Sequence, residues 1–138
     1  MATIKLGITG SRFGMNGLQM DTFISLLQDF KDKGVLISEF HQGQCLGVDV
    51  DSVPLVLELF PDCKVISHPP TKTHLVGNCT VHETREPRSY LVRDRNIVNE
   101  SDMLIAIPFD SEYNPRSGTW YTHNYAKSLD KSVILITK

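Results

Sequence analysis

The sequence has few cysteines, and their spacing indicates neither a disulfide-bonded fold nor a metal-binding one. Its three cysteines, Cys45, Cys63 and Cys79, are an odd number and include no Cys-x-x-Cys pair. This usage fits a reducing compartment better than a disulfide framework. The five histidines do not cluster with the cysteines at zinc-ligand spacing, so no metal site and no cofactor are predicted.

Long runs of one residue class are also missing. No apolar stretch reaches the length of a membrane span, and the first residues lack the charged and apolar regions of a signal peptide. There is no lysine or arginine run, and the formal net charge is only −2, so no nucleic-acid footprint is visible. We therefore expect a cytoplasmic protein that has no nucleic-acid or membrane partner.

What is present is an alternation of apolar strands and amphipathic helices. The 138 residues suffice for one domain with a proper core. The pattern predicts strands at 3–9, 35–40, 64–67, 103–107 and 132–137, and helices at 18–30, 48–60, 90–100 and 117–129. Such alternation predicts an α/β fold, a single Rossmann-like doubly wound sheet of about five mainly parallel strands in the order 3-2-1-4-5, with helices on both faces.

Two segments depart from this regular pattern. Pro54 lies inside the helix predicted at 48–60, which indicates a later start or a bend, because proline suits only the first turn of a helix. Residues 69–88 show no clear periodicity. A loop of this length is usually functional or mobile, so we predict a mobile flap over the carboxyl edge of the sheet.

The first strand is followed at once by Gly10, Ser11 and Arg12. Doubly wound folds place phosphate at this turn, although the Gly-x-Gly-x-x-Gly fingerprint is absent. Ser11 offers a hydroxyl and Arg12 a guanidinium to an anion. The alternative is a simple tight turn with a solvated arginine.

A second candidate anion site follows the strand at 103–107. Pro108 ends that strand, and the loop after it leads to a predicted helix start. That loop and helix start contain Glu112, Arg116, Ser117, Gly118 and Thr119. An uncapped helix N-terminus binds anions through its free N–H groups, and an arginine adds a bidentate cation. Ser117 or Thr119 could instead cap the helix, which would make this an ordinary connection. The predicted strand order brings both candidate sites to the same edge.

Further candidates lie between these turns. Gly43 and Gly47 stand between a strand and a helix, and Asp49 lies at the helix start, either as a dipole-stabilised carboxylate or in a ligand or catalytic role. His41 could contact a ligand or be a buried, satisfied histidine. Arg93, Arg95 and Asn96 lie on the helix that feeds the strand at 103–107, where a solvated face is the alternative.

Five motifs occur in a fixed order. They are Gly10-Ser11-Arg12, Gly43 with Gly47-Val48-Asp49, His68-Pro69-Pro70, the run of residues 90–98, and Arg116-Ser117-Gly118-Thr119-Trp120. Together they resemble the SLOG superfamily of Rossmann-like proteins, which includes the LOG phosphoribohydrolases and the DprA-like and YpsA-like proteins. The resemblance spans nearly the whole chain. It implies a nucleotide or nucleotide-derived ligand, which is hydrolysed or sensed, and a homodimer or higher assembly.

The resemblance also assigns roles. Phosphate would lie on residues 10–12 and 117–119, with Arg95 and Arg116 neutralising its charge and Asp49 or Asn96 holding the sugar. The LOG motif Pro-Gly-Gly-x-Gly-Thr-x-x-Glu supplies a glutamate that works with an arginine, to which Arg95 or Arg93 corresponds. Thr122 replaces that glutamate here. Asp49, Arg95 and Glu112 are thus the catalytic candidates for a nucleotide N-glycosidase, with Glu83 and Glu86 as weaker carboxylates. The alternative is a non-catalytic nucleotide sensor or sequestering protein.

Overall fold

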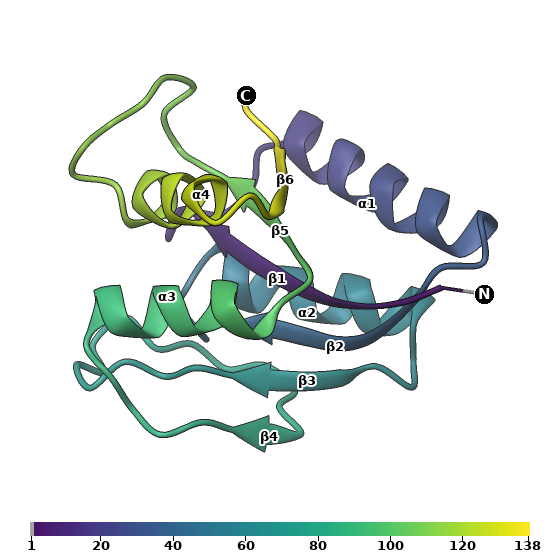
Figure 1. The fold of residues 1–138 in the computed structure, drawn as a ribbon, viewed down its shortest axis with the longest axis horizontal. Coiled ribbons are helices and arrows are strands. Elements are labelled where there is room, and N and C mark those ends of the chain that lie inside the picture. The colour runs from purple at the N-terminus through teal and green to yellow at the C-terminus, as the bar shows by residue number, and fades with distance from the viewer. Residues whose placement is uncertain (1) are drawn as a thin grey trace.

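The computed structural model describes residues 2–138, which form one parallel sheet between two layers of helices (Figure 1). The strands are β1 (Thr3–Gly10), β2 (Leu36–Gln42), β3 (Lys64–Ser67), β4 (Glu83–Thr84), β5 (Met103–Ile107) and β6 (Ser132–Leu135). Their order is β4-β3-β2-β1-β5-β6, and every neighbouring pair is parallel. The predicted order of five strands is confirmed, and the two-residue strand β4 adds a sixth strand at the edge next to β3.

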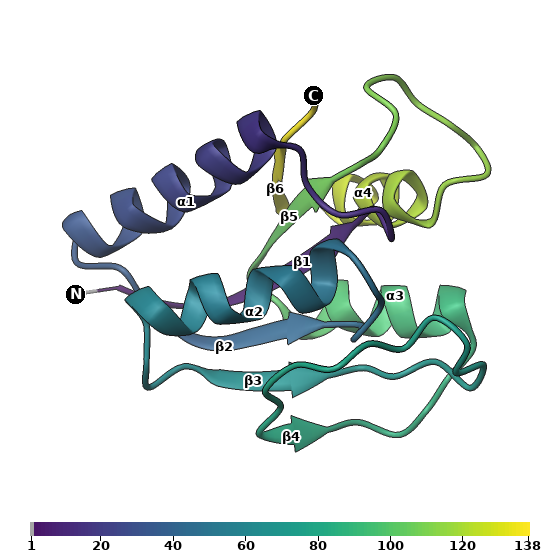
Figure 2. The ribbon, with the colours of Figure 1, turned by 180° about the vertical axis from the view of Figure 1, so that it is seen from behind.

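The four helices divide evenly between the faces of the sheet. They are α1 (Gly17–Asp32), α2 (Val48–Leu59), α3 (Tyr90–Glu100) and α4 (Gly118–Ser128). The helices α3 and α4 cover one face, and α1 and α2 cover the other, as the opposite views of Figures 1 and 2 show. This is the doubly wound arrangement that the sequence predicts.

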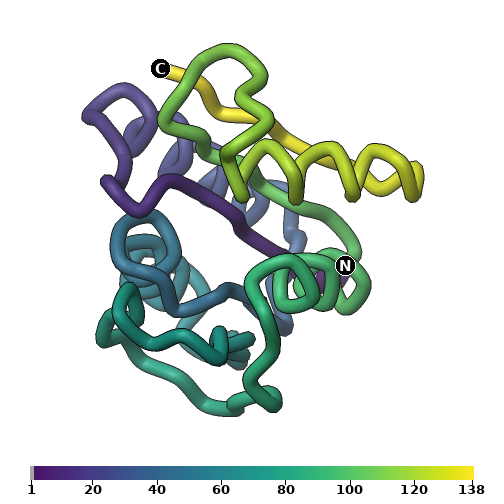
Figure 3. The backbone as a smooth tube through the Cα atoms, turned by 90° about the vertical axis from the view of Figure 1, so that its left-hand side faces the viewer, coloured from purple at the N-terminus to yellow at the C-terminus, as the bar shows by residue number. Residues whose placement is uncertain are grey.

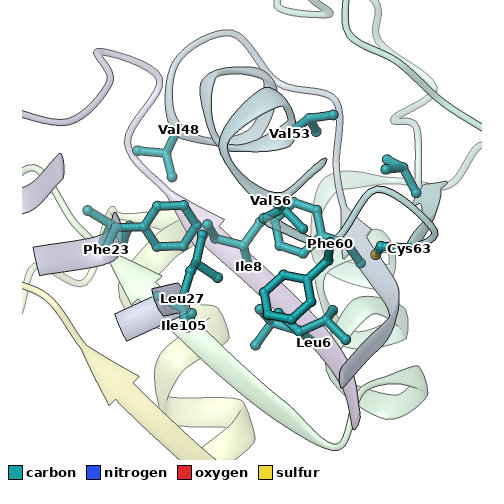
Figure 4. Packing of buried hydrophobic residues seen from close by; sticks show 14 of the residues in the cluster. Leu6, Ile8, Phe23, Leu27, Val48, Val53, Val56, Phe60, Cys63 and Ile105 are labelled. Atoms are coloured by element: carbon teal, nitrogen blue, oxygen red, sulfur yellow. The ribbon is translucent and has the colours of Figure 1, made fainter. Parts of the chain in front are cut away.

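The main core lies between β1 and the pair α1 and α2. Leu6 and Ile8 of β1 are fully buried against Phe23 of α1 and Val56 of α2 (Figure 4). A smaller cluster beneath α3 and α4 holds Ile97, Val98, Leu104 and Ala126. Because β1 is covered on both faces, its side chains need no polar alternation.

The helix α2 begins at Val48 and runs through Pro54. The predicted later start is therefore wrong. Proline removes one hydrogen bond within the helix, but Val48, Val53 and Val56 are all buried in the core. We attribute the continuity of the helix to this packing.

The segment predicted as a flap runs beside the loop that follows β2. Cys45 and Val76 form an antiparallel bridge, and Leu46 N donates to Leu75 O at 2.8 Å. The segment then returns to the sheet as β4, where Arg85 N donates to Ser67 O at 2.8 Å. Its predicted mobility stays a prediction. No helix within residues 2–138 is long and apolar enough to cross a membrane.

Candidate functional site

Three segments meet at the carboxyl ends of β1, β2 and β5, the edge that faces the viewer in Figure 3. They are the turn at residues 10–12, the loop at residues 43–47 and the start of α4. The backbone of Ser11 links the first turn to the end of β5 and to the start of α2, because its N–H donates to Ile107 O at 3.0 Å and its carbonyl accepts from Val48 N at 3.0 Å. The predicted adjacency of the strands at 6–9 and 103–107 is confirmed.

Two glycines allow the turn and the loop to touch. A Cβ on Gly10 would lie 2.4 Å from the Val48 side chain. Gly47 has a φ of +92°, and a Cβ there would lie 2.3 Å from the Ser11 carbonyl oxygen. Glycine at position 10 therefore leaves room for the Val48 side chain, and glycine at position 47 allows both the close approach to the backbone and the positive φ.

Asp49 is buried in the first turn of α2. Its Oδ2 accepts hydrogen bonds from Gly43 N and Cys45 N, each at 3.2 Å. Burial raises the pKa of this carboxyl to about 6, although the guanidinium of Arg93 and the two N–H donors pull it down. Asp49 can consequently exchange a proton near neutral pH.

Arg93 is the arginine that points into this site. Its Nε donates to Asp94 Oδ1 at 2.7 Å, and its Nη1 donates to the carbonyls of Gly43 at 2.8 Å and His68 at 3.3 Å. The ring of Tyr90 lies 5.5 Å from the guanidinium carbon. Gly43 is needed here too, because a Cβ on it would lie 2.3 Å from Arg93 Nη1.

Asp94 is a buried carboxylate that the sequence analysis did not single out. Burial raises its pKa, while Arg93 lowers it. A Cβ added to Gly118 would lie 3.7 Å from Asp94 Oδ2, so this carboxylate lies at the start of α4. Thr122 Oγ1 donates to Gly118 O at 2.7 Å and also lies beside Asp94. A hydroxyl carries one proton, so Thr122 donates either to this carbonyl or to the Asp94 carboxylate. An acidic group thus stands close to the position where Thr122 replaces the LOG glutamate.

The other predicted residues are placed around the rim or inside the fold. Arg12, Arg95, Glu112 and Arg116 are exposed, and Asn96 is half-buried. Arg95 does not reach Asp49 or Asp94. Residues two positions apart point in directions about 200° apart around a helix axis, so Arg95 faces away from the site when Arg93 faces inward. Thr119 is buried, as is Pro108, whose carbonyl accepts from Gln19 Nε2. Ser117 caps α4 by accepting from Trp120 N at 3.2 Å, so the expected uncapped helix start is wrong.

An aromatic group lies on the surface beside the turn at residues 10–12. The rings of Phe13 and Phe109 are 5.2 Å apart and both are largely exposed. The Arg12 guanidinium lies over Phe13, and Lys138 Nζ lies 3.5 Å from the centre of the Phe109 ring. These residues are remote in the sequence, so no local pattern could reveal the group.

The comparison with known proteins rests on structure. No protein-family model and no curated protein matches the sequence. A molybdenum cofactor binding protein from the phototrophic bacterium Rippkaea orientalis aligns over 100% of this chain and 78% of its own, with a TM-score of 0.71 and 19% identity. DNA processing protein A from Helicobacter pylori, described as binding single-stranded DNA, aligns over 96% of this chain and 64% of its own, with a TM-score of 0.65 and 19% identity.

A third solved structure, a structural-genomics target, aligns over 96% of this chain and 72% of its own, with a TM-score of 0.62 and 16% identity. The chain shares its fold with these three proteins. The predicted resemblance is confirmed at the level of the fold, which is what identities below 25% can establish. What these three proteins bind is a property of those proteins, and the fold is what they share with this chain.

Proposed function

We propose that this protein binds a nucleotide or nucleotide-derived ligand at the carboxyl ends of β1, β2 and β5. The observation that carries the proposal is the buried group of Asp49, Arg93 and Asp94 at this edge. Burying three charged side chains is costly even when they are paired. Clusters of this kind, with shifted carboxyl pKa values, concentrate at functional sites.

Buried polar atoms without hydrogen-bond partners support the proposal that a ligand binds nearby. Within residues 2–138, Gln42 Nε2 and Tyr90 Oη are buried and have no hydrogen-bond partner. Gln42 ends β2, and Tyr90 packs against Arg93. Buried polar groups are normally satisfied, so these two atoms are candidate ligand contacts.

If the site is catalytic, we propose cleavage of the N-glycosidic bond of a nucleoside monophosphate. An oxocarbenium-like transition state needs a carboxylate close by, and the leaving base needs a proton. Asp49 with its raised pKa suits proton donation, and Asp94 beside Arg93 suits charge stabilisation. A non-catalytic sensor remains the alternative, supported by Thr122 in place of the LOG glutamate.

Release of free base from a panel of nucleoside monophosphates, measured by chromatography, tests the reaction. For an enzyme, Asp49→Asn should lower the rate at least about 100-fold, whereas Glu112→Gln, on the exposed loop, should leave it unchanged. Turnover that survives Asp49→Asn would remove Asp49 from the mechanism. Activity that appears only in Thr122→Glu would identify the parent protein as a binder.

Binding is tested separately by calorimetry with the same nucleotides and with molybdenum cofactor. Arg93→Lys keeps the charge but loses the fork of donors, so affinity should fall by about 10-fold or more. The control is Arg95→Lys on the exposed side of the same helix. Equal affinities in the two variants would place the phosphate elsewhere.

Single-stranded nucleic acid is a second candidate ligand, supported by the exposed pair Phe13 and Phe109 with Arg12 and Lys138 beside it. Bases stack on aromatic faces and backbones pair with nearby cations. Fluorescence anisotropy with a labelled oligothymidylate tests this function. Binding that falls with salt and is lost in Phe13→Ser/Phe109→Ser would support it, and binding unaffected by the double variant would contradict it.

A further inference from the structure

Two buried histidines and a glutamate meet beside the proposed ligand site, on the α3 side of β2 and β3. His41 belongs to β2, His68 follows β3, and Glu100 ends α3. His41 Nδ1 lies 2.8 Å from His68 Nε2, and His68 Nδ1 lies 3.7 Å from Glu100 Oε2. One potential metal-ligating atom from each residue lies within 4.8 Å of the others.

The protons in this cluster do not satisfy every contact. His41 Nε2 lies 2.8 Å from Glu39 Oε1, so it carries a hydrogen and donates it to the carboxylate. His41 Nδ1 is then a lone pair and accepts the Nε2–H of His68. This leaves the lone pair of neutral His68 Nδ1 facing the carboxylate of Glu100. Two acceptors face one another, and a cation would resolve the contact.

A proton on His68 is one such cation, but its surroundings oppose it. The side chains of His41 and His68 are 0% and 2% exposed. Burial of both rings disfavours a charged imidazolium. Neutral imidazoles with free lone pairs are the form that binds metal ions.

The surrounding residues are arranged as they are around metal ligands. Glu39 fixes the tautomer of His41 from outside, as carboxylates do in carboxylate–histidine–metal groups. Arg85 donates to Glu100 Oε1 from Nη2 at 2.8 Å and from Nε at 3.0 Å. Its Nε also lies 3.4 Å from Oε2, the oxygen that faces His68. Arg85 therefore holds Glu100 mainly through Oε1.

We propose that His41, His68 and Glu100 bind one divalent transition-metal ion of the zinc class. Two imidazoles and one carboxylate suit Zn²⁺, Co²⁺ or Ni²⁺ rather than Mg²⁺ or Ca²⁺. Coordination at His41 Nδ1 and His68 Nε2 places the His68 hydrogen on Nδ1, where it faces Glu100, and the ion replaces the hydrogen between the two rings. Nitrogens on a tetrahedral ion with bonds of about 2.0–2.1 Å lie about 3.3 Å apart, so these two atoms must separate by about 0.5 Å. The side chain of Glu100 is 36% exposed, which gives the ion and a fourth, water ligand a route from solvent.

The ion would hold the end of α3 against β2 and β3. Its effect reaches the proposed ligand site through one contact, because His68 O accepts from Arg93 Nη1. The inference does not depend on the proposed function, since a structural ion could be present in a binder or in an enzyme. The sequence analysis considered only histidines near cysteines. His41 and His68 are distant in the sequence and come together only through the pairing of β2 with β3.

Untagged protein, stripped with a chelator and titrated with Co²⁺, tests the proposal. The ligand set predicts one ion per chain and the intense visible absorption of tetrahedral Co²⁺, which Zn²⁺ then displaces. His68→Gln should weaken binding more than about 100-fold, and Glu39→Gln about 10- to 100-fold. His74→Gln, at an exposed histidine outside the cluster, is the control and should bind as the parent does.

Glu100→Gln is a second test variant that should fold normally, because the Glu100 side chain lies partly in solvent. Zn²⁺ should raise the Tm of the parent, reversibly with chelator, and should shift the Tm of Glu100→Gln far less. A parent that binds no Co²⁺ would overturn the proposal and leave the cluster as a proton-linked histidine pair. Equal Zn²⁺ shifts in the parent and in Glu100→Gln would also overturn it.

Discussion

Arg93 and Arg95 differ by two positions on α3 and by their whole environment. Arg93 has a side chain 8% exposed and donates to a carboxylate and two carbonyls. Arg95 is exposed to solvent. The burial of Ile97 and Val98 fixes which side of the helix faces the sheet, and Arg93 lies on that side.

The first prediction compares these two arginines. Arg93→Leu leaves Asp94 buried without its partner, which should lower the free energy of unfolding by about 3–5 kcal/mol. Arg95→Leu should change it by no more than about 0.5 kcal/mol. Urea unfolding of both variants measures the difference. Equal losses in the two variants would mean that the Arg93–Asp94 pair contributes no more to stability than an exposed residue on the helix surface does.

The second prediction concerns the pH dependence of stability. The pKa of Asp49 rises from 3.8 to about 6 on folding, so the folded state holds its proton more tightly than the unfolded state. Stability from this group is therefore present below pH 4 and is lost as the pH rises from about 4 to 6, up to about 3 kcal/mol.

Asp49→Asn should abolish that loss. The unfolding free energy of the variant, relative to the parent, should increase between pH 4 and pH 6 and be constant above pH 7. Urea unfolding at several pH values measures this difference. A difference that does not change with pH would show that Asp49 titrates normally in the folded protein.

At the scale of elements, the site depends on close contacts between loops. The turn after β1 and the loop after β2 meet where Gly47 passes the Ser11 carbonyl. The residue Ser117 caps α4, and Asn16 and Gln19 form a reciprocal capping box at α1. The loops that precede α1 and α4 are thereby fixed by hydrogen bonds at the starts of these two helices.

The third prediction tests this contact with three glycines. Gly47→Ala combines a positive φ with a backbone clash, whereas Gly34→Ala has a φ of +74° and open space, and Gly17→Ala has open space and no positive φ. Gly34→Ala should cost about 1–3 kcal/mol, Gly47→Ala clearly more, and Gly17→Ala nothing. Thermal and urea unfolding give the ranking. Equal costs at positions 47 and 34 would show that the turn yields freely.

At the scale of the molecule, the reversal of strand order between β1 and β5 creates the candidate site. The chain runs from β1 outward through β2 to β4 and then returns to place β5 on the other side of β1. The two glycine-bearing turns and the start of α4 meet at this point because parallel strands share one carboxyl edge. Two surface hollows lie elsewhere, one along α1 and one at the opposite edge lined by Leu36 and Phe60.

The fourth prediction concerns assembly. The resemblance to SLOG proteins implies a homodimer or higher assembly, so light scattering after size exclusion should give at least twice the chain mass of 15.5 kDa. The double variant Phe13→Ser/Phe109→Ser serves as a comparison, because these exposed rings form an apolar patch. A parent of one chain mass at micromolar concentration would contradict the expectation of a homo-oligomer.

The sequence by itself determined the α/β class, the strand order and the convergence of two turns. Apolar runs and helical periodicity are local properties, and the handedness of crossovers limits the ways in which strands can be ordered. The N-terminal turn, Gly43, Gly47 and Asp49 were accordingly predicted at the correct edge.

Only the tertiary structure decided which charged groups face inward. The rotation of α3 about its axis follows from the packing of Ile97 and Val98, so it selects Arg93 and Asp94 over Arg95. The pairing of β2 with β3 brings His41 to His68, and the return of the chain beside β3 forms β4. Each of these contacts joins residues that are distant in sequence, and the side of a strand or helix that becomes buried depends on what packs against it.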